Sequence, residues 1–313
     1  MSTPMSFKRG SAALAAAVAV LAGIWLSAQT PQVFTFVVSA TDASGASVTD
    51  LRPEDVVMSE DGVRQQVVKV EPLAIPMKVT IAVDNGLESS EALGHYRAGL
   101  TGFIQALPPE VEITLITTAP QPRTVVKPTT DRTQILKGVT GFAPEQSRPR
   151  FSDALVEYSE RLQREVKDRT AQPYQPILLM LSTAAIEQRS YQPKEIEKAV
   201  AFLAQRHAKV NSIVVSTRTD AAQAGSLDLT LQAIVALPTA QATGGRYEGV
   251  AVANRLATLL PEWGHDLAAL HAKQMQQVRV TVERSHGGEL KSPRIELARP
   301  GLTGKVTVDG YLP

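Results

Sequence analysis

The run Lys78–Ser90 (KVTIAVDNGLESS) constrains the fold more than any other stretch of this chain. Apolar residues alternate with smaller ones as far as Val83, which predicts a strand, and an acidic turn with a glycine follows. Asp84 ends the strand, so we expect its carboxylate at the C-terminal edge of a sheet, where ligands bind in open α/β folds. Ser89 and Ser90 are typical N-caps for the amphipathic helix that we expect next.

Residues 77–274 alternate between strand-like and helix-like segments. Several expected strands are apolar almost throughout, as strands covered on both faces are. This alternation predicts a doubly wound, mostly parallel α/β sheet. We expect strands over 79–83, 112–117, 123–127, 177–181, 209–215 and 246–247, and helices over 90–107, 131–138, 153–169, 194–207, 228–236 and from 251 onward.

Two β segments, 29–76 and 275–313, flank that region. The dipeptide Asp61-Gly62 between β-prone runs is a strong hairpin signal. Each segment alone is too small to bury a core, so we predict that the two pair into one small β module. We expect its strands over 33–39, 55–59, 63–70, 277–283, 294–297 and 305–308, with a turn at 285–288.

The first 28 residues have the plan of a secretory signal peptide, because Lys8 and Arg9 precede an apolar run that ends near the small residue Ala28. We therefore expect an exported protein, periplasmic or extracellular. The alternative is an uncleaved anchor, the one way in which we expect membrane contact, although the run is shorter than the roughly 20 residues that span a bilayer. The chain has no cysteine, so it forms no disulfides. A net charge of +1 with mixed signs argues against nucleic acid as a partner.

Residues 37–67 (VVSATDASGASVTDLRPEDVVMSEDGVRQQV), followed in order by short motifs at 152–155, 242–246 and 298–301, resemble bacterial secreted proteins related to von Willebrand factor A (VWFA) domains. The resemblance covers nearly the whole chain after the signal segment. It implies a VWFA-like α/β domain with a metal-ion-dependent adhesion site at the C-terminal edge of its sheet. The matching positions in the first stretch are Gly45, Val48, Leu51, Asp55, Glu60, Asp61 and Gly62.

The adhesion site that the resemblance implies is degenerate here. The family holds its metal with an Asp-x-Ser-x-Ser signature, a Thr and a second Asp; this chain keeps Asp84 but has Gly86, Glu88, Pro149 and Thr183 at the other four positions. Magnesium and calcium need several hard oxygen ligands. We therefore expect no metal and no other cofactor, with Asp84 and Glu88 as the weak candidates for residual metal binding.

We expect a non-catalytic binding module, active in protein–protein interaction or adhesion, whose partner is a protein. One interpretation of Arg148 and Arg150 is that they present cations to an acidic partner. The alternative is that their loop is a solvated connection without a partner. A competing hypothesis is a hydrolase with Asp84 and Glu88 as general acid and base. The alternative role for these residues is structural: Asp84 caps its turn or pairs with a basic residue, and Glu88 is solvated. A third hypothesis is a structural envelope component. The candidate residues of the binding edge are Asp84, Asn85, Glu88, Arg148, Arg150 and Thr183.

Overall fold

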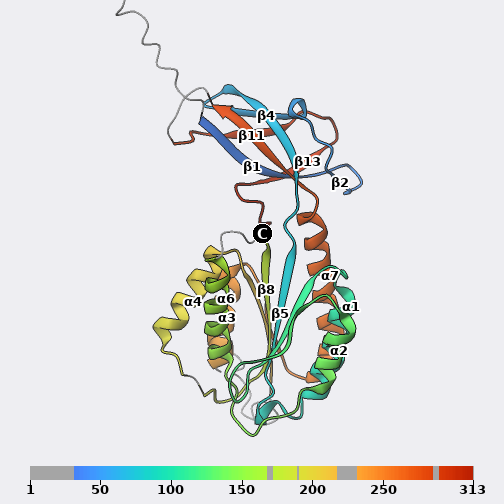
Figure 1. The fold of residues 1–313 in the computed structure, drawn as a ribbon, viewed down its shortest axis with the longest axis vertical. Coiled ribbons are helices and arrows are strands. Elements are labelled where there is room, and N and C mark those ends of the chain that lie inside the picture. The colour runs from blue at the N-terminus through green and yellow to red at the C-terminus, as the bar shows by residue number, and fades with distance from the viewer. Residues whose placement is uncertain (1–31, 168–171, 189, 217–230, 285–288, 313) are drawn as a thin grey trace, which may run out of the picture.

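The computed structural model describes residues 32–167, 172–188, 190–216, 231–284 and 289–312. The predicted signal segment and the expected turn at 285–288 lie outside these ranges. An α/β domain and a smaller β module lie end to end, so the molecule is elongated (Figure 1). Within the described ranges, no helix is both long and apolar enough to cross a bilayer.

The α/β domain is built on a six-stranded sheet with the order β10-β9-β8-β5-β6-β7. All neighbouring strands are parallel except β7, which runs antiparallel to β6 at one edge. Numbered along the chain from the β7 edge, this is the order 3-2-1-4-5-6 of doubly wound sheets, and it confirms the predicted fold class. The strands are β5 (Met77–Val83), β6 (Glu112–Thr117), β7 (Arg123–Thr129), β8 (Gln175–Thr183), β9 (Lys209–Val215) and β10 (Tyr247–Val250).

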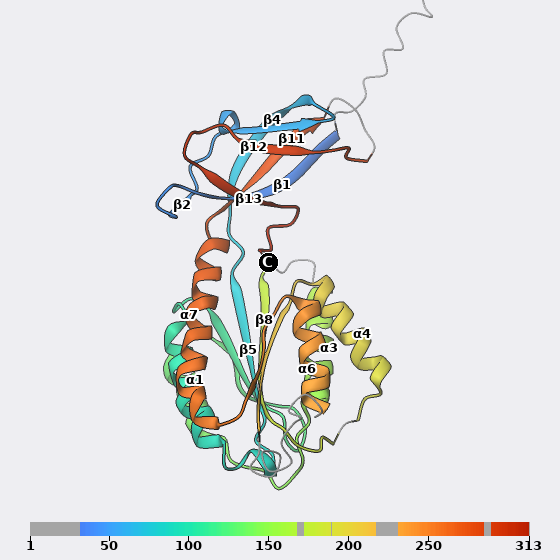
Figure 2. The same cartoon turned by 180° about the vertical axis from the view of Figure 1, so that it is seen from behind.

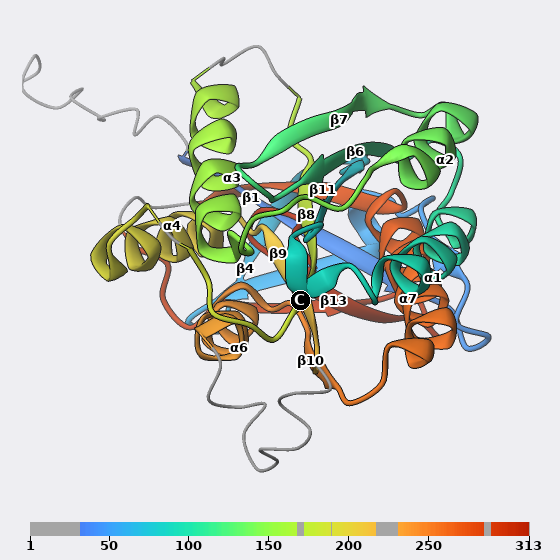
Figure 3. The same ribbon diagram turned by 90° about the horizontal axis from the view of Figure 1, so that it is seen from below.

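Helices cover both faces of this sheet, because alternate residues of its strands are apolar on each side. Figure 3 shows α1, α2 and α7 on one face and α3, α4 and α6 on the other. Ile81 belongs to the first of these cores, and Ala82, the next residue, to the second. The helices are α1 (Leu93–Ala106), α2 (Arg132–Gly141), α3 (Phe151–Val166), α4 (Pro193–Gln205), α6 (Leu231–Thr243) and α7 (Leu256–Gln274).

The start of α1 differs from the sequence prediction. Ser89 and Ser90 do not cap it: a 3₁₀ turn, η2 (Leu87–Ser89), comes first, and the N-cap position is Ala92, with no side-chain cap. The Ser89 hydroxyl is used instead at the sheet edge, as described below. Helix α2, by contrast, is capped by Asp131, whose carboxylate accepts hydrogen bonds from two backbone amides of the first turn.

The β module interleaves strands from the two ends of the chain in one seven-stranded sheet. Its main order is β12-β3-β4-β11-β1-β13, so the C-terminal β11 lies between the N-terminal β4 and β1 and is antiparallel to both (Figure 2). Phe36, Met58 and Val280 are fully buried in its core. The strands are β1 (Gln32–Thr41), β2 (Ser47–Val48), β3 (Val56–Glu60), β4 (Val63–Leu73), β11 (Gln277–Arg284), β12 (Arg294–Leu297) and β13 (Thr303–Thr307).

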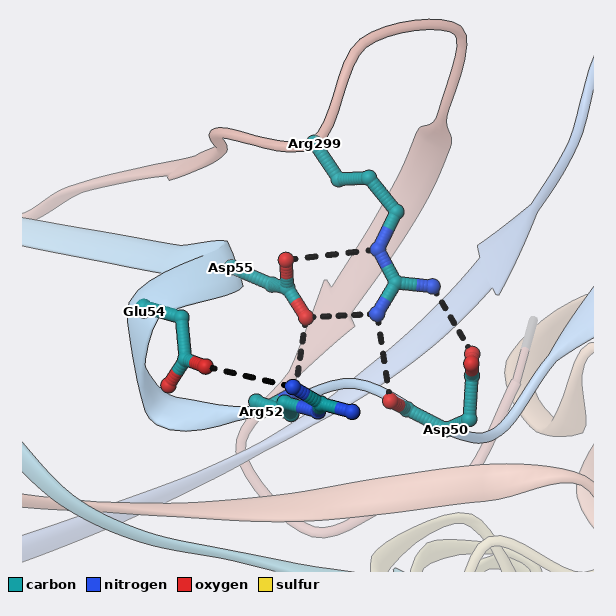
Figure 4. Close-up of polar contacts among 5 residues, drawn as sticks. All are labelled: Asp50, Arg52, Glu54, Asp55 and Arg299. Carbon is teal, nitrogen blue, oxygen red and sulfur yellow. Dashed lines mark hydrogen bonds and ion pairs between the residues drawn. The ribbon is translucent and has the colours of Figure 1, made fainter.

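Arg299 forms ion pairs outside the sheet that join the C-terminal part of the β module to its N-terminal part (Figure 4). Its guanidinium donates to both carboxylate oxygens of Asp55, at 3.2 and 2.6 Å, and to the Asp50 carboxylate at 2.8 Å. A forked pair of this kind is stronger and more directional than a single contact. The exposed pair of Arg52 and Glu54, at 3.9 Å, lies beside it.

The C-terminal segment joins the β module to the α/β domain, and Figure 1 marks the chain's C-terminal end between them. The Tyr311 ring stacks on the His207 ring, with centroids 4.4 Å apart, and the Tyr311 hydroxyl donates to the Tyr174 carbonyl at 3.4 Å. The Asp309 carboxylate lies 2.7 Å from His207 Nε2. These contacts fix one end of the α/β domain against the β module and leave the carboxyl edge of the sheet at the far end.

Candidate functional site

Asp84 and Thr183 meet at the carboxyl edge of the α/β sheet. Each follows or ends one of the two central strands, β5 and β8, which are parallel neighbours. The Asp84 amide donates to the Leu181 carbonyl at 2.8 Å, which holds the two strand ends together. This is the switch point of a doubly wound sheet, where ligand sites are usual.

The Asp84 carboxylate is nevertheless closed off, with 1% of the residue exposed. Oδ1 accepts from the Gly86 amide at 2.8 Å, and Oδ2 accepts from the Ser89 hydroxyl at 2.6 Å, the Ser182 hydroxyl at 3.3 Å and the Thr183 amide at 3.4 Å. Within the described part of the chain, no Lys or Arg is paired with it. Burial raises the pKa of the Asp84 carboxyl, and the donors act against that rise.

Hydroxyl groups continue the network behind Asp84. Thr183 Oγ1 lies 2.8 Å from Ser89 Oγ and 2.8 Å from the Tyr96 hydroxyl. All four side chains are buried, and burial, followed by the charge of Asp84, raises the pKa of Tyr96. No local sequence pattern indicates these roles, because Ser89 has the pattern of a helix cap and Tyr96 lies within the helix predicted over 90–107.

Asn85 holds the loop between α2 and α3, residues 142–150, against this edge; we call it the covering loop. Its side-chain amide donates to the Ala143 carbonyl at 2.9 Å, and its side-chain oxygen accepts from the Ala119 amide at 3.1 Å. Its backbone carbonyl accepts from the Glu145 amide at 2.7 Å. Asn85 is 3% exposed, so its polar groups serve the loop and are not presented to a partner.

The same loop leaves no room for a side chain at Gly86. A Cβ atom there would lie 2.7 Å from the Ser147 carbonyl oxygen and 3.2 Å from the Pro149 nitrogen. The Leu87 amide donates to the same Ser147 oxygen at 2.9 Å, which holds the loop in this position. A serine, the residue of the family signature, therefore does not fit at 86 in this arrangement. The described residues also contain no group of three or more His, Cys, Asp or Glu side chains placed to hold a metal ion.

Glu88 lies at a cavity beside the sheet edge. Glu91, His95 and Val252 also line this cavity of about 470 Å³, and the Oε2 atom of Glu88 is buried without a hydrogen-bond partner in the described structure. No hydrogen bond links the described side chains of Glu88 and Asp84. Asp84 is 1% exposed, whereas Glu88 is partly exposed at the cavity.

The two arginines of the covering loop differ in accessibility. Arg148 is exposed. Arg150 is half-buried, and its Nη1 atom donates to the Asp153 carboxylate at 2.7 Å and to the Ser190 hydroxyl at 2.8 Å. Arg150 thus fixes the start of α3, and Arg148 is the cation that this loop offers to solvent.

Exposed aliphatic side chains mark the same end of the domain, which Figure 3 views from below. Leu87 follows β5 and is 48% exposed, Ile186 follows β8 and is 70% exposed, and Val252 follows β10 and is 59% exposed. The sequence analysis did not single out these residues, because a lone apolar residue in a loop gives no pattern.

No family model matches the chain, and no curated protein is significantly similar to it in sequence. Solved structures are similar in fold at low identity. A von Willebrand factor type A protein from Catenulispora acidiphila is 10% identical, with 88% of this chain and 72% of that one covered and a TM-score of 0.48. The conserved hypothetical protein BatB from Bacteroides thetaiotaomicron is 13% identical (62% and 98% covered, TM-score 0.44), and the SpRpn10 VWA domain is 12% identical (58% and 94%, TM-score 0.43). At such scores the fold assignment rests on the strand order itself, and no residue's role is transferred.

Proposed function

We propose that this protein is an exported, non-catalytic module that binds another protein through the carboxyl edge of its VWFA-like sheet, without a metal ion. The observation that carries the proposal is the burial of the Asp84 carboxylate. A carboxylate that is 1% exposed, and that protein donors already satisfy, is not available to a metal, a water nucleophile or a substrate.

The same edge offers what a protein partner uses. Leu87, Ile186 and Val252 are exposed aliphatic side chains, and Arg148 and Glu88 add charge of both signs. Apolar contacts surrounded by charged groups are typical of protein interfaces. The signal-like segment before residue 29 supports export. The competing hypotheses are a hydrolase that uses Asp84 and Glu88, which predicts an activity that Asp84→Asn removes, and a purely structural envelope component, which predicts no edge-dependent partner.

The deciding experiment is capture of a partner from the native envelope with the tagged protein, in magnesium and in EDTA. Ile186→Glu places a charge at the edge, and we expect it to abolish capture. The matched control is Val308→Glu, since Val308 is 74% exposed but lies on the β module. Capture that EDTA abolishes, or that Ile186→Glu leaves intact, contradicts the proposal.

Metal independence has its own measurement. We expect millimolar magnesium, calcium or manganese to leave the melting temperature unchanged. A metal site with a dissociation constant of about one-tenth of the metal concentration would add roughly 1.4 kcal/mol, which a melting curve resolves. A metal-dependent rise that Asp84→Ala removes would mean that Glu88 or Thr183 completes a site.

A further inference from the structure

A second cavity lies between the two parts of the molecule, at the opposite end of the sheet from the proposed binding edge. Its volume is about 690 Å³, within the range of roughly 300–1,000 Å³ that small-molecule sites occupy. The start of β9, the turn before β10, the second half of α7 and strand β13 of the β module contribute its walls.

The charges of this cavity are strongly unbalanced. Its lining contains Lys209, Arg246, Lys273 and Lys305 but one acidic residue, Asp266. Arg246 engages that residue, with Nη1 and Oδ2 2.6 Å apart. Within the described ranges, none of the three lysines is paired with a carboxylate. The cavity therefore has a net positive field that attracts anions.

Lys209 is the deepest of these cations. It is 9% exposed, and its Nζ atom donates to the Gly244 carbonyl at 3.3 Å, a neutral partner. Burial lowers the pKa of the Lys209 ammonium. A buried charge without a counter-ion is unfavourable, and a bound anion would remove that cost.

Asn211 is a second, independent indication that this cavity binds an anion. It lies two residues after Lys209 in β9, so both side chains are on the same face of the strand, and it also lines the cavity. Its Oδ1 atom accepts from the Arg246 amide at 3.0 Å, but its buried Nδ2 has no acceptor among the described residues. A buried unsatisfied donor is costly, so this group also lacks a partner that an anion would supply.

Apolar surface lies beside these donors. Trp263, Leu267 and Leu312 line the cavity, and the Arg246 guanidinium lies over the Trp263 ring at 5.9 Å. The arrangement is that of a small-molecule site, in which a few polar groups fix orientation and apolar surface supplies contact area.

We propose that this cavity binds a small organic anion, with its carboxylate or phosphate head at Lys209 and Asn211 and its apolar body against Trp263 and Leu267. Lys305 of the β module lines the same cavity, and in this proposal it adds a second cation to the anionic head, so the ligand contacts both parts of the molecule. Binding of this kind stabilises the two parts together.

The test is calorimetric titration of the purified protein with benzoate and with phenyl phosphate, the two arms that separate carboxylate from phosphate recognition. Acetate and inorganic phosphate are the head-group controls, and sodium chloride matches ionic strength. We expect saturable binding of at least one aromatic anion, tighter than that of its head group alone. Heat that follows ionic strength alone, with no saturation by either aromatic anion, overturns the proposal.

Variants locate the site. Lys209→Met keeps an unbranched side chain, one atom shorter, but removes its charge, and we expect affinity to fall roughly tenfold or more. Lys305→Gln changes an exposed side chain and should also weaken binding. Lys137→Gln, an exposed lysine of α2, is the control and should change nothing. Binding that survives both Lys209→Met and Lys305→Gln unchanged overturns the proposal, and if Lys209→Met fails to fold, Lys305→Gln decides.

Discussion

The Ser89 hydroxyl lies 2.6 Å from Oδ2 of Asp84 and donates to it. Ser89 is outside the family's signature, one position beyond Glu88, yet a hydroxyl still reaches the carboxylate because η2 turns the chain back toward the sheet. The Ser182 hydroxyl and the Thr183 amide donate to the same oxygen. Asp84 therefore acts as an acceptor that organises the sheet edge.

We expect Asp84→Ala to destabilise the protein by about 2–3 kcal/mol, because it leaves the Gly86 amide buried without its acceptor and removes the short hydrogen bond from the Ser89 hydroxyl. Urea unfolding with an unchanged m-value measures the loss. Glu91→Ala is the matched control: Glu91 is an exposed acid near the same edge, and its loss should stay within about 0.5 kcal/mol. Equal stability of Asp84→Ala and wild type would show that the cost of burying the charge cancels the gain from its hydrogen bonds.

Acid unfolding should depend on the pair of Arg299 and Asp55 (Figure 4). Hydrogen bonds from Arg299, then from the Arg52 amide, lower the pKa of the Asp55 carboxyl from its ordinary value of 3.8. A carboxyl group whose pKa is lowered by folding stabilises the folded protein fully at pH values above its ordinary pKa. That stabilisation is lost as the pH falls through the folded-state pKa. We therefore expect Asp55→Asn to be less stable than wild type at neutral pH, with the difference shrinking as the pH falls from about 5 to about 2.

Urea midpoints across that pH range measure this effect. The control is Glu54→Gln, next to Asp55, whose contact with Arg52 is long and exposed. Its stability should run parallel to that of wild type at every pH. A constant difference between Asp55→Asn and wild type would mean that ionisation of Asp55 does not contribute.

The sequence predicted the architecture well, because the apolar strand patterns around Ile81 and Leu179 are local signals that burial on two faces imposes. The end of β5 also placed Asp84 correctly at the carboxyl edge. Whether Asp84 is open or closed was not predictable, because that depends on the loop at Ser147, far along the chain. No linear pattern records such a contact.

Tertiary contacts also explain what else was missed. Ser89 was interpreted as a helix cap since Ser has that local role, but its partners Asp84 and Thr183 are 5 and 94 residues away. Lys209 reads as the first residue of an apolar strand, and its place in a cationic cavity appears only when β13 and α7 pack beside it.

A chain that begins at Met77 should lose the β module, because β11 then loses both of its neighbours, β4 and β1. Val278, Val280 and Val282, each at most 1% exposed in the full chain, become accessible on strands with unpaired edges. We expect this shortened chain to aggregate, to bind a hydrophobic dye and to melt at a lower temperature. Adding residues 29–76 as a separate peptide should restore solubility, and a scrambled peptide of the same composition should not. A soluble shortened chain with the melting temperature of the full protein would show that the α/β domain is stable without the interleaved strands.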